Sequence, residues 1–167
     1  MGQLITTAVV ETIQTPALDT SIYAANDRLG AIMTLSNVCR NPGGVVELVD
    51  VLLTDSTATS SISVDILFFD SLPTVASADN AAINISDTEI LKLCGSVSLL
   101  TGNYKSTASN GYIYATGLNM LMKPVAPSAS VGIVASSNLY ALMVLRAGTP
   151  TFAANSIQLR MRFKQLS

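Results

Sequence analysis

Polar and apolar residues alternate with a period of two along several short segments of this chain. The clearest is segment 157–164, whose apolar row is Ile157, Leu159, Met161 and Phe163 and whose polar row is Gln158, Arg160, Arg162 and Lys164. Residues 61–69 alternate over seven positions and then end in two phenylalanines. Because successive side chains of a strand point to opposite faces, this pattern predicts strands with one buried face.

Further strands are predicted where similar segments lie between turn residues. They cover residues 5–15, 31–40, 45–53, 96–101, 111–118, 130–134, 138–146 and 156–163. Asn41-Pro42-Gly43-Gly44 predicts a tight turn, because proline fixes φ and glycine tolerates a positive φ. Strands 45–53 and 61–69, separated by one polar loop, are expected to pair. We therefore predict an all-β fold, an antiparallel β-sandwich that is jelly-roll-like.

One short α-helix is predicted over residues 87–94. Ser86-Asp87-Thr88-Glu89 fits a capping box, in which the serine hydroxyl accepts an early N–H and the glutamate reaches back. Gly95 follows the predicted helix and can adopt the left-handed conformation that ends many helices. A helix of about two turns is too short to be stable alone and must be held by packing.

The length of 167 residues is typical of a single domain. We predict the β-sandwich over residues 19–167 and a possible N-terminal arm over residues 1–18. The arm is indicated because alternation there is imperfect and the segment precedes the first clear turn. A domain of this size buries roughly 70% of its unfolded surface and needs no metal or disulfide to be stable.

The segment Leu139–Leu145 is apolar on both faces, which a strand of a simple sandwich should not be. One row holds Leu139, Ala141, Met143 and Leu145, and the other holds Tyr140, Leu142 and Val144. The side chains of the second row must also be shielded from water. Either a long loop of this chain or another subunit could cover them, and the sequence pattern does not favour one over the other. With 49% apolar residues in the whole chain, we predict a homo-oligomer with Tyr140, Leu142 and Val144 as candidate interface residues.

Arg160, Arg162 and Lys164 share the outer row of the last strand. The favoured interpretation is a solvated strand face whose charges prevent edge-to-edge aggregation. The alternative is a basic stripe that binds an acidic partner, which makes these three residues candidate interface residues as well. The net charge of −2 argues against nucleic-acid binding. No apolar run is long enough for a transmembrane helix, so no membrane partner is expected.

The chain has little with which to perform chemistry. It contains no histidine, and its two cysteines, Cys39 and Cys94, match no metal-binding spacing. Paired carboxylates could support a hydrolase, with Asp50 and Asp55 or Asp65 and Asp70 as the candidate pairs, although turn and strand-end roles are favoured for Asp55 and Asp70. Asp79 and Asp87 lack the spacing of a calcium loop. We expect no catalytic residue, no cofactor and no metal.

The order of these segments resembles a family of structural proteins from the heads of tailed bacteriophages, described as decoration or cement proteins. The resemblance runs in order from Ala31 to Phe163. It rests on Ile66-Leu67-Phe68-Phe69-Asp70-Ser71, on Asp79-Asn80-Ala81-Ala82, on the predicted helix from Ser86 to Gly95, and on residues 137–152. It implies a trimer on the outer capsid surface of the virion, bridging major capsid protein subunits, made in the bacterial host cytoplasm.

Two other classes of function stay open. A carbohydrate- or receptor-binding β-sandwich of a phage fibre or tail would need an aromatic platform, for which Tyr104, Tyr112 and Tyr114 are the candidates. Only 5% of residues are aromatic and none is tryptophan, which counts against this class. A carboxylate-based hydrolase is the other alternative, and few polar groups converge to support it.

Overall fold

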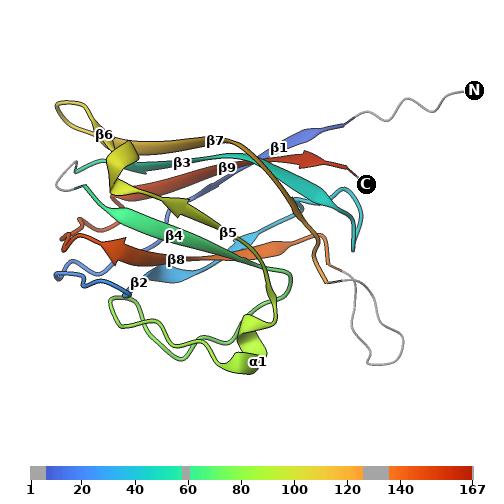
Figure 1. Ribbon diagram of the computed structural model, residues 1–167, viewed down its shortest axis with the longest axis horizontal. Coiled ribbons are helices and arrows are strands. Elements are labelled where there is room, and N and C mark those ends of the chain that lie inside the picture. Colours follow the sequence, from blue (N-terminus) through green and yellow to red (C-terminus); the bar gives the residue numbers. More distant parts are fainter. Residues whose placement is uncertain (1–6, 58–60, 126–135, 167) are drawn as a thin grey trace, which may run out of the picture.

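Nine strands form two antiparallel sheets that face each other in the computed structural model, which describes residues 7–57, 61–125 and 136–166 (Figure 1). The first sheet has the order β1-β9-β3-β7-β6 and the second has the order β2-β8-β4-β5. The elements are β1 Val9–Gln14, β2 Arg28–Leu35, β3 Val46–Asp55, β4 Ser63–Phe69, α1 Asp87–Ile90, β5 Leu93–Leu99, the 3₁₀ helix η1 Thr101–Asn103, β6 Lys105–Ser106, β7 Gly111–Met122, β8 Leu139–Ala147 and β9 Ile157–Gln165.

The pairing of the strands identifies the fold as a jelly roll. The hydrogen-bonded pairs β1–β9, β2–β8, β3–β7 and β4–β5 nest inside one another along the chain. The chain therefore forms one long folded ribbon, with β4–β5 at its tip, wrapped into two four-stranded layers. The short strand β6 adds a fifth member to the first sheet. The predicted all-β, jelly-roll-like sandwich is confirmed.

The alternating rows supply the core between the sheets. The apolar row of β9 is fully buried, as is the row of β8 that includes Ala141 and Met143. In β3 the buried residues change parity, from Leu48 to Val51, because a β-bulge lies between Leu48 and Asp50. The extra residue turns the second half of the strand so that both halves face the core.

The predicted pairing of 45–53 with 61–69 is wrong. β3 pairs with β7 and β9, whereas β4 pairs with β5 and β8 in the other sheet. β3 and β4 thus lie in different layers, because jelly-roll pairing follows the folded ribbon and not neighbourhood in sequence. The predicted strand 130–134 lies outside the described residues.

The N-terminal boundary of the domain also needs correction. Residues 9–14 form β1, which pairs with β9 over six residues. Pro16 and Leu18 are buried, and a Cβ on Gly30 would lie 2.6 Å from the Cβ of Pro16. Residues 9–18 are thus part of the sandwich and not an arm, while residues 1–6 lie outside the described part.

The helix is shorter than predicted. It ends at Ile90, with Leu91 as its C-cap, and Cys94 and Gly95 belong to β5. Gly95 has no positive φ. A Cβ there would lie 2.7 Å from Sδ of Met120, so this glycine allows β5 to approach β7. None of the helices in the described ranges is long and apolar enough to cross a membrane.

The tight turn before β3 is confirmed. The N–H of Gly44 donates to the carbonyl of Asn41 at 2.9 Å, and Gly43 has a φ of 72°. Proline at the second position and a positive φ at the third are the features of a type II turn.

Candidate interaction surface

The outer row of β8 is covered by the chain itself. Leu142 and Val144 point away from the core between the sheets, yet both have 0% exposure, and Tyr140 is half-buried. In Figure 1 the green segment between β4 and α1 runs along this side of the second sheet. The interface predicted at Leu142 and Val144 is therefore wrong, because a loop of the same chain supplies the cover that the pattern required.

The covering segment, residues 70–86, is held chiefly by Asp79. Its carboxylate accepts the N–H of Gly30 at 2.6 Å, the N–H of Asp19 at 2.6 Å and the hydroxyl of Tyr23 at 2.9 Å. Burial raises the pKa of Tyr23, and the neighbouring Asp79 raises it further, so the phenol remains a donor. With these donors around it, Asp79 is a structural acceptor, and the calcium role considered for it has no support.

Arg28 joins the same segment to β2. Its N–H donates to the carbonyl of Ala81, and its own carbonyl accepts the N–H of Asn80, each at 3.0 Å. Its guanidinium donates to the carbonyl of Ser77 at 2.6 Å. The cover is thus hydrogen-bonded along the edge of the second sheet.

The outer side of the first sheet has no such cover. We call it the open face, formed by the outward side chains of β1, β9, β3 and β7. Its residues include Val9, Glu11, Ile13, Glu47, Asp50, Leu52, Tyr112, Tyr114, Leu121, Arg160, Arg162 and Lys164. Strand register aligns them in rows, so that Ile13 lies beside Arg160, Arg160 beside Leu52 and Leu52 beside Tyr114.

The basic residues of the open face are paired within the sheet. Arg162 binds both carboxylate oxygens of Asp50, at 3.0 Å and 2.8 Å from its Nε, and donates to the hydroxyl of Tyr114 at 2.8 Å. Hydrogen bonding to Asp50 raises the pKa of Arg162, which stays protonated. Because Asp50 is buried, its carboxylate relies on this partner for its hydrogen bonds.

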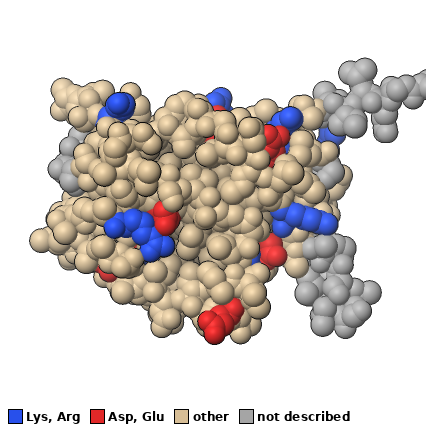
Figure 2. All heavy atoms as spheres, in the orientation of Figure 1, with Lys and Arg blue, Asp and Glu red and all other residues tan. Residues whose placement is uncertain are grey.

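Arg160 and Lys164 also have acidic neighbours. Arg160 lies 3.8 Å from Glu11, and Lys164 lies 3.5 Å from Glu47. The row is therefore not a free basic stripe, which weakens the interpretation of an acidic partner. Figure 2, which shows one side of the molecule, likewise shows few charged side chains on a largely uncharged surface, several of them with the opposite charge adjacent.

The sequence interpretation did not assign Glu47 and Asp50 to this face. They are three residues apart, so a regular strand would direct them to opposite sides. The bulge brings both outward, into register with Lys164 and Arg162. The available signal was the presence of two acids in a strand that is otherwise apolar.

Exposed apolar side chains surround these ion pairs. Val9, Ile13 and Leu121 are 62%, 58% and 61% exposed, and Tyr112 and Tyr114 are partly exposed on the same side of β7. A hollow of about 200 Å³ is lined by Ile13, Leu52, Thr54, Gln158 and Arg160. The face offers apolar and aromatic contacts with fixed polar groups between them, as protein interfaces do.

The tyrosines considered as a sugar platform do not come together. Tyr104 packs against the core, with its hydroxyl over Gly111, so a Cβ there would overlap it. Tyr112 and Tyr114 remain on the open face. Burial raises the pKa of Tyr104.

The candidate carboxylate pairs are occupied by structural contacts. Asp55 accepts the N–H and the hydroxyl of Thr57 at 2.9 Å and 2.6 Å, the strand-end turn that was predicted for it. Asp65 accepts from Ser98 at 2.6 Å and from Arg146 at 2.7 Å. Within the described ranges, no group of three or more histidine, cysteine or acidic side chains is placed to hold a metal ion.

The two cysteines are free thiols. Burial raises the pKa of Cys39 to about 11 and that of Cys94 to about 12, with the charge of Asp70 adding to the effect at Cys94. Both thiols are therefore protonated and unreactive near neutral pH.

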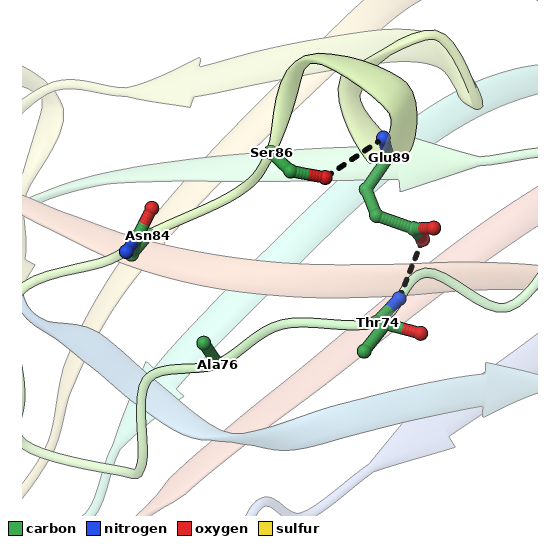
Figure 3. Close-up of a pocket in the computed structure, with 5 residues that line it drawn as sticks. All are labelled: Thr74, Ala76, Asn84, Ser86 and Glu89. Atoms are coloured by element: carbon green, nitrogen blue, oxygen red, sulfur yellow. Dashed lines mark hydrogen bonds between the residues drawn. The ribbon is translucent and has the colours of Figure 1, made fainter.

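A second hollow, of about 400 Å³, lies between the covering segment and α1 (Figure 3). It is lined by Thr74, Ala76, Asn84, Ser86 and Glu89. Ser86 caps α1 by accepting the N–H of Glu89 at 3.4 Å, as predicted, but the Glu89 carboxylate accepts the N–H of Thr74 at 2.6 Å instead of reaching back. Glu89 is thus part of the loop structure, and no aromatic side chain lines the hollow.

Comparison with known proteins gives little. No family model matches the sequence, and no curated protein matches it. A chain from Desmodium yellow mottle tymovirus is 13% identical, with a TM-score of 0.27 over 99% of this chain and 89% of that one. A chain from turnip yellow mosaic virus is 11% identical, with a TM-score of 0.33 over 100% of this chain and 85% of that one. At such TM-scores neither likeness carries a conclusion about fold or function.

Proposed function

We propose that the chain is a non-enzymatic structural protein of a virus particle, a decoration or cement protein on the outer surface of a tailed-phage head. The observation that carries the proposal is the jelly-roll pairing of the strands. Jelly rolls occur in capsid, lectin and cupin domains, so the fold alone does not choose among these functions. The resemblance of residues 31–163 to phage head proteins favours the first.

The chemistry of the described residues supports a structural role. Asp50, Asp65 and Asp79, whose carboxylates could otherwise act on a substrate, serve as acceptors within the fold. The cysteines are buried or partly buried thiols, and the chain has no histidine for a metal site of the cupin kind. What remains accessible is a surface suited to contact.

We assign the open face as the surface that binds the major capsid protein. Its charges balance, since Glu11, Glu47 and Asp50 oppose Arg160, Arg162 and Lys164. A partner surface of mixed apolar and neutral polar character fits it better than an acidic one. Contacts repeated on neighbouring capsomers would strengthen attachment, because later contacts form at high effective concentration. The trimer implied by the resemblance has no support from β8, whose outer row is covered.

The test uses particles of the phage that encodes the chain, prepared without it. Added protein should appear on the outside of the particles by electron cryo-microscopy and should raise their melting temperature. Leu121→Arg on the open face should reduce the number of bound copies. Ala78→Arg, at an exposed position of the covering segment, is the matched control and should bind as the wild type does. Absence of the intact protein from mature particles contradicts the proposal.

A carbohydrate- or receptor-binding module is the second candidate, favoured by the exposed Tyr112 and Tyr114 on one side of β7. Aromatic rings presented together can stack on sugars. A glycan array would decide: binding lost in a Tyr112→Ala, Tyr114→Ala double variant supports this candidate, and no glycan signal excludes it in favour of the first.

A further inference from the structure

The two sheets have four edges, and three of them are covered, short or broken by an irregularity. β6 contains only two residues, and the part of β7 beyond it is broken by positive φ angles at Gly117 and Asn119 and by a register shift against β3. Along β2, Arg28 is hydrogen-bonded through both backbone groups to residues 80 and 81, and the side chain of Gln14 reaches the carbonyl of Thr34 at 3.5 Å. β5 is broken by a β-bulge, because Gly95 pairs with Phe68 and Leu93 with Phe69, and a bulge turns an edge strand away from further pairing. These are common ways of protecting a sheet edge.

The fourth edge, β1, is open. The N–H of Gln165 donates to the carbonyl of Ala8 at 2.8 Å, in the same register that pairs Val9 with Lys164. Because hydrogen-bonded pairs alternate along an antiparallel ladder, residues 8, 10, 12 and 14 bond to β9. The N–H and C=O groups of Val9, Glu11 and Ile13 therefore point away from the sheet, and within the described ranges none has a hydrogen-bond partner.

Neighbouring bonds on β9 agree with this assignment. The N–H of Leu166 donates to the carbonyl of Val45 at 3.0 Å, in register with β3. Odd-numbered residues of β9 thus bond to β1 and even-numbered ones to β3, as an interior strand requires. The bonds of β9 to β1 and to β3 therefore agree that the free N–H and C=O groups of β1 point away from the sheet.

The composition of β1 does not protect this edge. Four of its six residues are β-branched (Val9, Val10, Thr12 and Ile13), only Glu11 is charged, and none is proline or lysine. Val9 and Ile13 also expose more than half of their side chains. A strand with high β-propensity and free backbone groups is a template for a further strand.

We propose that β1 pairs antiparallel with β1 of a second copy of this chain, joining two five-stranded sheets into one continuous sheet. Head-to-tail pairing would need a second regular open edge, and the other three edges are covered, short or broken by bulges and register shifts. The edge can then meet only its own equivalent, which gives a closed two-fold dimer and not a fibre.

The register of the pair is restricted by charge and by side-chain direction. Residues directly opposite each other must lie on the same face of the joined sheet. Placing Glu11 on the two-fold axis would set two carboxylates opposite each other, which is unfavourable. Registers centred on Val9 or Ile13 would pair little of β1 with its equivalent. The two that remain place Val10 or Thr12 on the axis, and in both of them the N–H and C=O of Glu11 gain partners, at Val9 or Ile13 of the second copy.

The first experiment is sedimentation velocity of the purified full chain over a wide range of concentration. We expect a monomer–dimer equilibrium in the wild type. Glu11→Pro removes one outward N–H without losing a bond to β9, because proline is tolerated at such edge positions, and should weaken dimerisation at least tenfold. Glu11→Ala keeps the N–H and should dimerise at least as well as the wild type. Thr12→Pro removes a bond to β9 and should instead lower the melting temperature.

A second measurement covers the case in which Glu11→Pro does not fold. Val10→Cys and Thr12→Cys are oxidised separately, and the variant whose cysteine lies on the two-fold axis should form a disulfide-linked dimer, since opposing residues there are close enough for a disulfide. A monomer at every concentration, a trimer, or unchanged dimerisation of folded Glu11→Pro overturns the proposal. No particles are used, so the result is independent of the proposed capsid function.

Discussion

The outer faces of the two sheets differ, although the inner face of each sheet is apolar. β8 and β9 each lie next to an edge strand of their sheet. The outer row of β8 is apolar and covered by residues 70–86, while that of β9 carries Arg160, Arg162 and Lys164 and is open. The alternation of side chains assigns each residue to the inner or the outer face of a strand. Whether the outer face is apolar or charged then indicates whether that face is covered.

The cover itself is held largely by polar contacts. Asp79 and Arg28 provide the hydrogen bonds that join the segment to residues 19–30. A cover within the same chain needs no association between copies, so the apolar row of β8 is buried at any protein concentration. The open face, in contrast, can be buried only by a partner.

The largest expected effect compares two leucines on these two faces. Leu142→Ala should destabilise the fold by about 3 kcal/mol, because it leaves a cavity under the covering segment. Leu121→Ala, on the open face, should change stability by less than about 0.5 kcal/mol. Urea unfolding of both variants measures the difference. Equal effects would mean that the two faces are not covered differently.

Asp79→Ala tests the attachment of the cover and should cost about 2–3 kcal/mol, since several donors lose a charged acceptor. Hydrogen exchange should increase along residues 70–86 and at Gly30, whose N–H is released. Asp87→Ala, in the first turn of α1, is the control and should leave exchange at Gly30 unchanged. Unchanged exchange in Asp79→Ala would show that other contacts hold the segment.

The sequence predicted what depends on nearby residues and missed what depends on distant ones. The strands, the turn at Gly43 and the cap at Ser86 follow from local pattern. Gly95 was assigned to the end of a helix because its contact with Met120, on another strand, is not visible in the sequence. The pairing of β3 was likewise wrong, since residues more than 100 positions apart pair in β3 and β9.

The sequence pattern allowed either a loop of this chain or another subunit to cover Leu142, and only the structure decides between these two alternatives. A segment rich in serine, alanine and asparagine has no periodicity that would reveal its path. Asp79 was visible only as an isolated acid, and its role depends on donors at Asp19, Tyr23 and Gly30. For the open face, the outer row of β9 was predicted correctly, but its acidic partners on β3 depended on a bulge.

Arg162→Met tests the ion pairs of the open face. It leaves Asp50 buried without its main partner and should lower the melting temperature, less than for a fully buried pair because Arg162 is partly exposed. Adding Asp50→Leu should recover most of that loss, since the unpaired charge is removed. Thermal unfolding of the single and double variants checks this, and a double variant less stable than Arg162→Met would contradict it.

The smallest effect concerns Glu89, where the cover meets α1. The side chain of Lys92 and the N–H of Thr74 hold the pKa of Glu89 below its ordinary value of 4.5. A lowered pKa means that the carboxylate stabilises the fold above about pH 4.5 and that this contribution is lost as the pH falls below it. Glu89→Gln should therefore melt slightly lower than the wild type at neutral pH, and the two curves should converge in acid. Lys92→Met, which removes the larger cause, should also reduce the pH dependence. A difference between wild type and Glu89→Gln that stays constant from neutral to acidic pH would show that the Glu89 carboxylate does not stabilise the cover through its charge.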